Sequence, residues 1–191
     1  MKQTIHYLKN TFHNIFRTIF MHICTHFKHT DLRFIITAAI LGTFNHFLYF
    51  LSGHSAITAL FCPINESIWE HLKLLFFPFL FVTIWEYWSR RPAILPFFYC
   101  RYLGAASGMA FIISVFYTYS GVIGRNFLAL DILTFYSSVL FSFYISEYLS
   151  GKFRSAPESD SAFVISLWVV TAFFFFVFTC FPPDLPLFYS P

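Results

Sequence analysis

Apolar side chains dominate the chain from residue 34 onward, in long runs separated by short polar stretches. Each run is long enough to cross a hydrocarbon core of about 30 Å as a helix that rises about 1.5 Å per residue. The pattern therefore predicts an all-α integral membrane protein, with a bundle over residues 32–191. Its five transmembrane helices are predicted at 34–51, 66–88, 97–118, 127–149 and 162–181.

Residues 1–31 follow a different pattern. Between Ile5 and Phe27, apolar residues recur at steps of three and four, and lysine, arginine and histidine fill the other positions. This pattern predicts a basic amphipathic helix that lies in the membrane interface. The i, i+4, i+7 spacing of His22, His26 and His29 suits metal chelation, but it is more typical of the polar rim of such a helix.

The first linker, residues 52–65, contains no charged residue and includes the apolar stretch Ala-Ile-Thr-Ala-Leu-Phe. An exposed loop would be more polar. We expect a short re-entrant or interfacial segment that folds back over the bundle. The alternative is a simple extension of the first membrane helix.

Composition and charge narrow the class of protein. Hydrophobic residues make up 58% of the chain and charged residues only 11%, against about 25% charged in soluble domains. The predicted partner is therefore the lipid bilayer, and no basic blocks interleaved with aromatics indicate a nucleic-acid surface. Lysine and arginine precede the first span and recur at 90–91 and 152–154, which predicts an inside N-terminus and an outside C-terminus.

Two small patterns concern packing and redox state. Gly104 and Gly108 stand four residues apart, the spacing that lets membrane helices approach closely. The cysteines form no C-x-x-C pair. Cys62 and Cys180 are both expected at outer helix ends, where a disulfide is an alternative to two free thiols.

A cluster of ionisable residues opens the second predicted span. Asn65 or Ser67 caps this helix, and Glu66 complements the dipole of its N-terminus. Glu70 and Lys73 lie deeper and within about 60° of Glu66 around the helix. Ionisable groups at such depth are costly and normally face the interior of the bundle, paired with one another.

Polar residues of the other spans are predicted at the same height. They are His46 and Asn45 of the first span, Tyr117 and Tyr119 of the third, and Arg125, Asn126 and Asp131 at the start of the fourth. Together with Asn65, Glu66, Glu70, His71 and Lys73 they predict an outward-facing polar pocket. Glu86 and Glu147 are instead expected to snorkel at the inner helix ends.

Three hypotheses fit this pocket. In the first, it binds or moves a small solute, an ion or a proton. In the second, it is a zinc hydrolase in which His46, His71 and a carboxylate hold the metal; Glu70 or Asp131 is the ligand and the other is the catalytic base. In the third, the charges only pair, and the chain is a structural or partner subunit. Five spans are few for a transporter built from repeats, so transport would require a homo-oligomer or a membrane partner.

The motif N-E-S-x-W-E-H-x-K, residues 65–73, resembles a family of small multi-pass prokaryotic membrane proteins of unknown function. The stretches "YTYSGVIGRNFLALDI" and "PPDLPLF" are similar to later segments of that family. The resemblance covers most of residues 34–188 and does not include the basic N-terminal helix. It implies a compact helical fold in a prokaryotic cytoplasmic membrane, and it implies no activity.

Overall fold

The computed structural model describes residues 32–153 and 161–190, and throughout these residues the regular structure is helical. The predicted interfacial helix at 1–31 lies outside the described residues. Five of the helices are long and apolar enough to cross a membrane, as the sequence predicts. They are α2 (Leu32–Leu51), α4 (Ile68–Arg90), α5 (Ile94–Ile123), α6 (Leu128–Lys152) and α7 (Ser161–Cys180); the short α3 (Ala56–Phe61) and η1 (Pro186–Phe188) complete the set.

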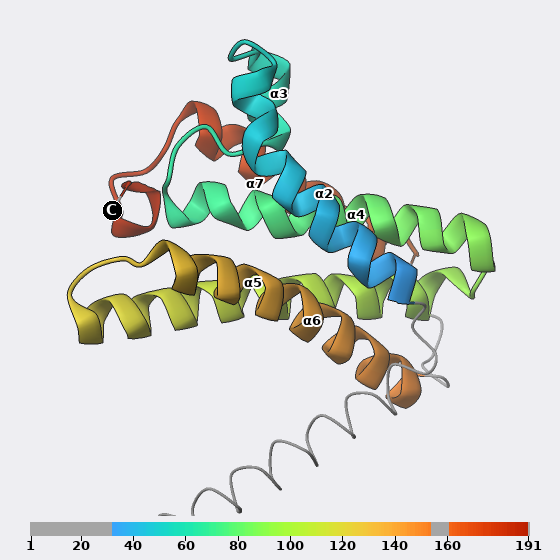
Figure 1. The fold of residues 1–191 in the computed structure, drawn as a ribbon. Helices are drawn as coiled ribbons and strands as arrows, with labels where there is room; N and C mark the ends of the chain where they lie inside the picture. Colours follow the sequence, from blue (N-terminus) through green and yellow to red (C-terminus); the bar gives the residue numbers. More distant parts are fainter. Residues whose placement is uncertain (1–31, 154–160, 191) are drawn as a thin grey trace, which may run out of the picture.

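Successive long helices run in alternating directions, so the bundle has two ends (Figure 1). One end, called here the Cys62 end, holds residues 52–67, the α5–α6 turn at 124–127 and the C-terminal segment 181–190. The other, called the Arg91 end, holds the α4–α5 turn at 91–93, the start of α2 and the end of α6. The predicted outer side corresponds to the Cys62 end.

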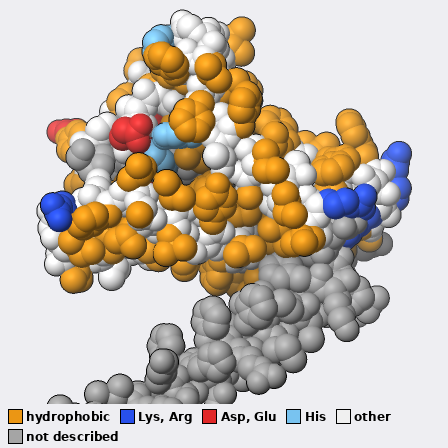
Figure 2. All heavy atoms as spheres, viewed as in Figure 1, with side chains coloured by type: hydrophobic (Ala, Val, Ile, Leu, Met, Phe, Trp, Pro, Cys, Tyr) orange, Lys and Arg blue, Asp and Glu red, His pale blue; other side chains and the backbone are white. Residues whose placement is uncertain are grey.

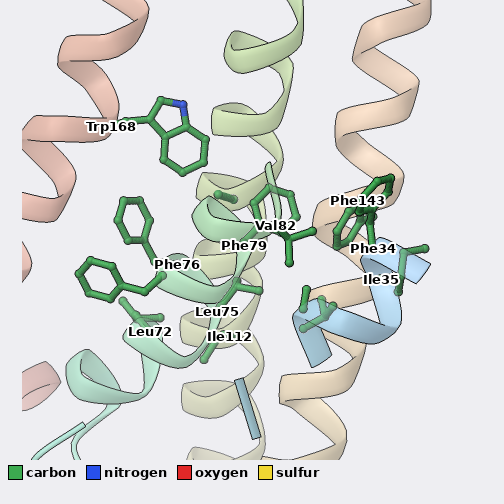
Figure 3. Close-up of a cluster of buried hydrophobic side chains, with 14 of the residues drawn as sticks. Phe34, Ile35, Leu72, Leu75, Phe76, Phe79, Val82, Ile112, Phe143 and Trp168 are labelled. Atoms are coloured by element: carbon green, nitrogen blue, oxygen red, sulfur yellow. The ribbon is translucent and has the colours of Figure 1, made fainter. Parts of the chain in front are cut away.

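Helix α4 is the centre of the bundle. Of its most apolar stretch, 67% is buried, against 11–28% in the other four long helices. Its side chains meet all four of them: Phe76 packs against Trp168 of α7 and Phe79 against Phe143 of α6, while α2 and α5 close the remaining sides (Figure 3). The faces of the other helices that turn away from α4 expose large apolar residues, as expected of helices surrounded by lipid.

Helices α5 and α6 form a closely packed antiparallel hairpin. A Cβ atom added at Gly104 would lie 2.5 Å from the backbone oxygen of Ser142, and one at Gly108 would lie 1.9 Å from the Ser142 hydroxyl oxygen. Along α6, Thr134, Ser138, Ser142 and Ser146 are buried at four-residue steps. The small-residue pattern in the sequence therefore marks internal packing between neighbouring helices.

The uncharged linker contains a helix of its own. Helix α2 ends at Leu51, a turn with positive φ at Gly53 and His54 follows, and α3 then starts at Ala56. The alternative of one extended first helix is therefore wrong. Helix α3 folds back and its Phe61 packs on Phe77 of α4 and Phe176 of α7, which places its C-terminus beside the polar start of α4.

Substituting Gly104 by alanine should destabilise the bundle, because the new methyl group meets backbone atoms of α6 that cannot rotate away. We expect a loss on the order of 1–3 kcal/mol, the usual range for overpacking, measured as a lower melting temperature in detergent. Gly121→Ala is the matched control: Gly121 lies in the same helix with nothing within 4 Å of the added atom. Equal melting temperatures for the two variants would show that α5 and α6 are not packed this closely.

Candidate functional site

The polar start of α4 is built by local capping. The Ser67 hydroxyl oxygen accepts a hydrogen bond from the Glu70 backbone N–H at 3.3 Å, and the helix begins at Ile68. The Asn65 side-chain oxygen accepts from the Ser67 N–H at 2.9 Å and so fixes the turn before the cap. Of the two predicted caps, Ser67 is the one that starts the helix.

Lys73 is fully buried and lies at the centre of a polar cluster. Its side chain is 0% exposed and its ammonium group is 2.8 Å from a carboxylate oxygen of Glu70. The same ammonium donates to the backbone oxygens of Ala59 at 2.9 Å and Cys62 at 3.4 Å, and to the Thr179 hydroxyl oxygen. An ammonium has three N–H donors, so every donor of Lys73 has an acceptor from the protein.

Both carboxylate oxygens of Glu70 also have polar neighbours. One carboxylate oxygen accepts from Lys73 and from the backbone N–H of Ile64 at 3.0 Å, and the other lies 3.3 Å from the Thr179 hydroxyl. The side chain is 3% exposed. The pair therefore joins α4 to the 59–64 segment and to α7, more than 100 residues along the chain. Thr179 was not among the predicted site residues, because a lone threonine in an apolar helix gives no sequence signal.

A second group of predicted residues lies at the surface beside this pair. His71 makes two polar contacts: Nδ1 lies 2.9 Å from the Ser67 carbonyl oxygen, and Nε2 lies 3.3 Å from a Glu66 carboxylate oxygen. The His46 ring of α2 is 5.6 Å from the His71 ring, centroid to centroid, and its Nδ1 is buried without a hydrogen-bond partner. Figure 2 shows acidic and histidine side chains side by side on this surface. Glu66, His71 and His46 are called the polar rim below.

Asn45 holds the linker segment in place next to the polar rim. Its amide nitrogen donates to the Phe61 carbonyl oxygen at 3.0 Å, and its side-chain oxygen accepts from the Cys62 thiol at 2.7 Å. Burial raises the pKa of Cys62 to about 11, although the nearby Lys73 charge acts in the opposite direction. Cys62 is thus a neutral thiol at physiological pH. Cys62 and Cys180 are both free thiols, the first buried and the second exposed.

The remaining predicted residues lie at the Cys62 end but are not joined to these two groups by any interaction within the described residues. Asp131 accepts a hydrogen bond from the Tyr119 hydroxyl, which ties α6 to α5. Arg125 is exposed and stacks over the Phe127 ring at 4.5 Å, while its neighbour Asn126 is partly exposed in the same turn. No ion pair joins Arg125 to Asp131 in the described part of the chain.

The described residues contain no assembled set of metal ligands. In residues 32–153 and 161–190, no group of three or more histidine, cysteine, aspartate or glutamate side chains is placed to hold an ion. Glu70, the carboxylate in the zinc hypothesis, accepts hydrogen bonds from Lys73 and Ile64, whereas His71 contacts Glu66.

The structure also contains a buried charge network that the sequence analysis missed. At the Arg91 end, Arg101 of α5 is 1% exposed and pairs with Glu86 of α4 and, at 3.4 Å, with Glu147 of α6. Arg90 is 2.9 Å from the other oxygen of Glu86. The prediction that Glu86 snorkels to water is wrong, because its side chain is 2% exposed. An arginine inside the third apolar run was the signal that could have revealed the network.

Five apolar helices and buried ion pairs define a multi-pass α-helical membrane protein. Residues 21–190 match the family model described as "Family of unknown function (DUF6512)", and the chain belongs to that family. The match starts at residue 21, so it extends into the N-terminal segment that the motif resemblance leaves out. No curated protein matches the chain, and no solved structure does.

The Glu70–Lys73 pair can be tested by single and double substitution. Glu70→Gln or Lys73→Met leaves one buried charge without its counter-ion, which costs roughly 3–5 kcal/mol when a buried pair is broken. The double variant removes both charges and should recover most of that loss. Melting temperatures in detergent provide the measurement. If the single variants melt like the unmodified protein, the pair does not hold the bundle together.

Proposed function

We propose that this membrane protein binds a proton at the polar rim, on the side of the membrane that the Cys62 end faces. The observation that carries the proposal is the surroundings of His71. Both of its ring nitrogens lie against oxygen atoms, the Ser67 carbonyl on one side and the Glu66 carboxylate on the other. A carbonyl oxygen can only accept a hydrogen bond, so Nδ1 must carry a hydrogen.

The contact between Nε2 and Glu66 then requires one additional proton. An ionised carboxylate only accepts, so a neutral imidazole with its hydrogen on Nδ1 would meet Glu66 acceptor to acceptor. The contact is favourable when the imidazole is protonated, or when the carboxyl group carries the proton instead. The His71–Glu66 pair is therefore a site that holds one proton and separates when that proton leaves. Histidine suits this role because its charge changes between about pH 5 and 8.

The groups around His71 allow only one of the two neighbouring imidazole rings, His71 and His46, to carry a positive charge. His46 faces it from α2, and a second imidazolium 5.6 Å away would be repelled. The positive end of the α4 dipole also disfavours a cation at this height, which makes Glu66 the group that stabilises it. On α4 itself, Glu70 and Lys73 neutralise each other and contact the linker and α7.

Proton binding from one side is better supported than proton movement through the bundle. Below the polar rim, the inward face of α4 is formed by Leu72, Leu75, Phe76 and Phe79, all buried among other apolar side chains (Figure 3). These residues offer no hydrogen-bonding side chain toward the Arg91 end. Exchange with the solvent next to Glu66, which is 69% exposed, needs no such path.

A second candidate function is that of a structural or partner membrane subunit. The hydrogen bonding of the buried pair favours it, because every N–H donor of Lys73 and both carboxylate oxygens of Glu70 already contact protein groups. The two candidates concern different residues. The buried pair serves as an anchor, and the polar rim beside it exchanges protons.

Charge distribution supports an orientation with the Arg91 end in the cytoplasm. Among the described residues, the Arg91 end carries five basic and two acidic residues, whereas the Cys62 end carries two basic and four acidic ones. An excess of positive charge is typical of the cytoplasmic side. This orientation places the polar rim outside the cell.

Glu66→Gln should broaden the NMR signal of the ring N–H on Nε2 of His71, because the proton proposed to lie between Nε2 and the carboxylate loses its charged acceptor. NMR of nitrogen-15 histidine-labelled protein measures the signal, and the signal that disappears in His71→Asn identifies the residue. His54, whose exposed ring packs against Tyr49 and Phe50, is the internal control. An unchanged Nε2–H signal of His71 in Glu66→Gln would contradict the proposal.

Labelling of Cys180 tests the orientation. In a Cys24→Ser variant, a membrane-impermeant maleimide added to intact cells should modify Cys180, which is exposed at the Cys62 end. Cys62 and Cys100 are buried and should stay unmodified, and a further Cys180→Ser substitution provides the blank. Labelling that requires permeabilised cells would place the polar rim on the cytoplasmic side instead.

A further inference from the structure

The lipid-facing surface at the Arg91 end combines aromatic and basic side chains. Along α4, Phe81, Trp85 and Trp88 are 50%, 43% and 66% exposed and recur at i, i+4 and i+7, so they form one outward stripe. The stripe ends at Arg91, which closes the helix in a left-handed conformation with φ 49° and is itself exposed. Tryptophan and arginine in this order are typical of the level where lipid headgroups begin.

Helix α2 adds a second arginine to the same place. The Arg33 guanidinium lies 5.9 Å from the centre of the Phe34 ring, and the Arg90 guanidinium lies 5.0 Å from it. Phe34 in turn meets Trp85 edge to face, with ring centres 4.8 Å apart. The start of α2 and the end of α4 therefore present Arg33 and Arg90 around one aromatic group, and Arg91 follows Arg90 in the chain.

Among the described residues, the two acidic side chains at this end lie behind the surface and do not reach Arg91. Glu86 is buried and is shared by Arg90 and Arg101, and Glu147 of α6 contacts Arg101. The described residues offer Arg91 no ion pair. Its positive charge thus lies beside an apolar stripe at the membrane surface, and the group that complements both features is an anionic lipid: a phosphate for the arginine and an acyl chain for the stripe.

We infer that the Arg91 end binds the headgroup of an anionic phospholipid, with Arg91 and Arg33 at the headgroup and one acyl chain along Trp88, Trp85 and Phe81. Arg90 pairs with Glu86, and its positive charge lies on the protein side of the headgroup. The inference is independent of proton binding at the polar rim, which lies at the other end of the bundle.

Quenching of tryptophan fluorescence measures such a lipid directly. The full-length protein is placed in phosphatidylcholine bilayers with an equal mole fraction of either acyl-brominated phosphatidylglycerol or acyl-brominated phosphatidylcholine. We expect stronger quenching by the brominated phosphatidylglycerol, and loss of this difference in Trp85→Phe/Trp88→Phe. The effect should weaken at high salt.

Arginine substitutions decide which residues are responsible. Arg91→Gln should reduce the preference for phosphatidylglycerol about fivefold, and Arg33→Gln added to it about fivefold more, as expected for single charges near an anionic surface. Arg125→Gln, an exposed arginine at the opposite end, is the matched control and should leave the preference unchanged. Melting temperatures confirm that each variant is folded.

Three results would overturn the inference. The first is equal quenching by the two brominated lipids. The second is an equal loss of preference in Arg125→Gln and Arg91→Gln, which would indicate general charge attraction. The third is displacement of the quencher by inorganic phosphate, which would assign the arginines to a soluble anion.

Discussion

Charged groups inside a lipid bilayer must find partners within the protein. In this protein the constraint applies above all to helix α4. Helix α4 carries Glu70 and Lys73 in its first turns and Glu86 about four turns further along, and all three side chains are almost fully buried. Water cannot solvate them there, so neighbouring segments have to supply the hydrogen bonds. Lys73 obtains them from α3, the following linker and α7, and Glu86 obtains them from Arg90 and Arg101.

The two charged clusters also explain why the bundle has a defined arrangement. Apolar surfaces alone specify little between membrane helices, because lipid tails are as apolar as the side chains they replace. Lys73 reaches Thr179, and Arg101 reaches Glu147, in only one register between the two helices that carry each pair. The glycine–serine contacts between α5 and α6 add a steric condition of the same kind. Together these contacts bring the first turns of α4 close to α2, where the histidines of the polar rim meet.

Much of the fold follows from the sequence, and the site follows only in part. Span number and order depend on hydrophobic runs, which are local, so they are predicted to within a few residues; α5 is the exception and extends to Ile123. The i, i+3 pairing of Glu70 with Lys73 follows from helix periodicity. Its completion by Thr179 depends on which helices become neighbours, which no local pattern records. Arg101 was overlooked because one charge does not interrupt a hydrophobic run, although Glu86 and Glu147 at similar depth indicate its partners.

The closing of the Lys73 cluster by the last helix has a consequence for biosynthesis. Thr179 is made 106 residues after Lys73, which at about 5–20 residues per second corresponds to roughly 5–20 s of translation. During that interval Glu70 is the partner that Lys73 has within its own helix, because residues three apart already face each other. Phe188, whose ring packs against Trp69 of α4 with ring centres 5.0 Å apart, is made later still. The start of α4 is thus completed only after α7 and the segment that follows it have been synthesised, and a product truncated before α7 would lack the Thr179 acceptor of Lys73.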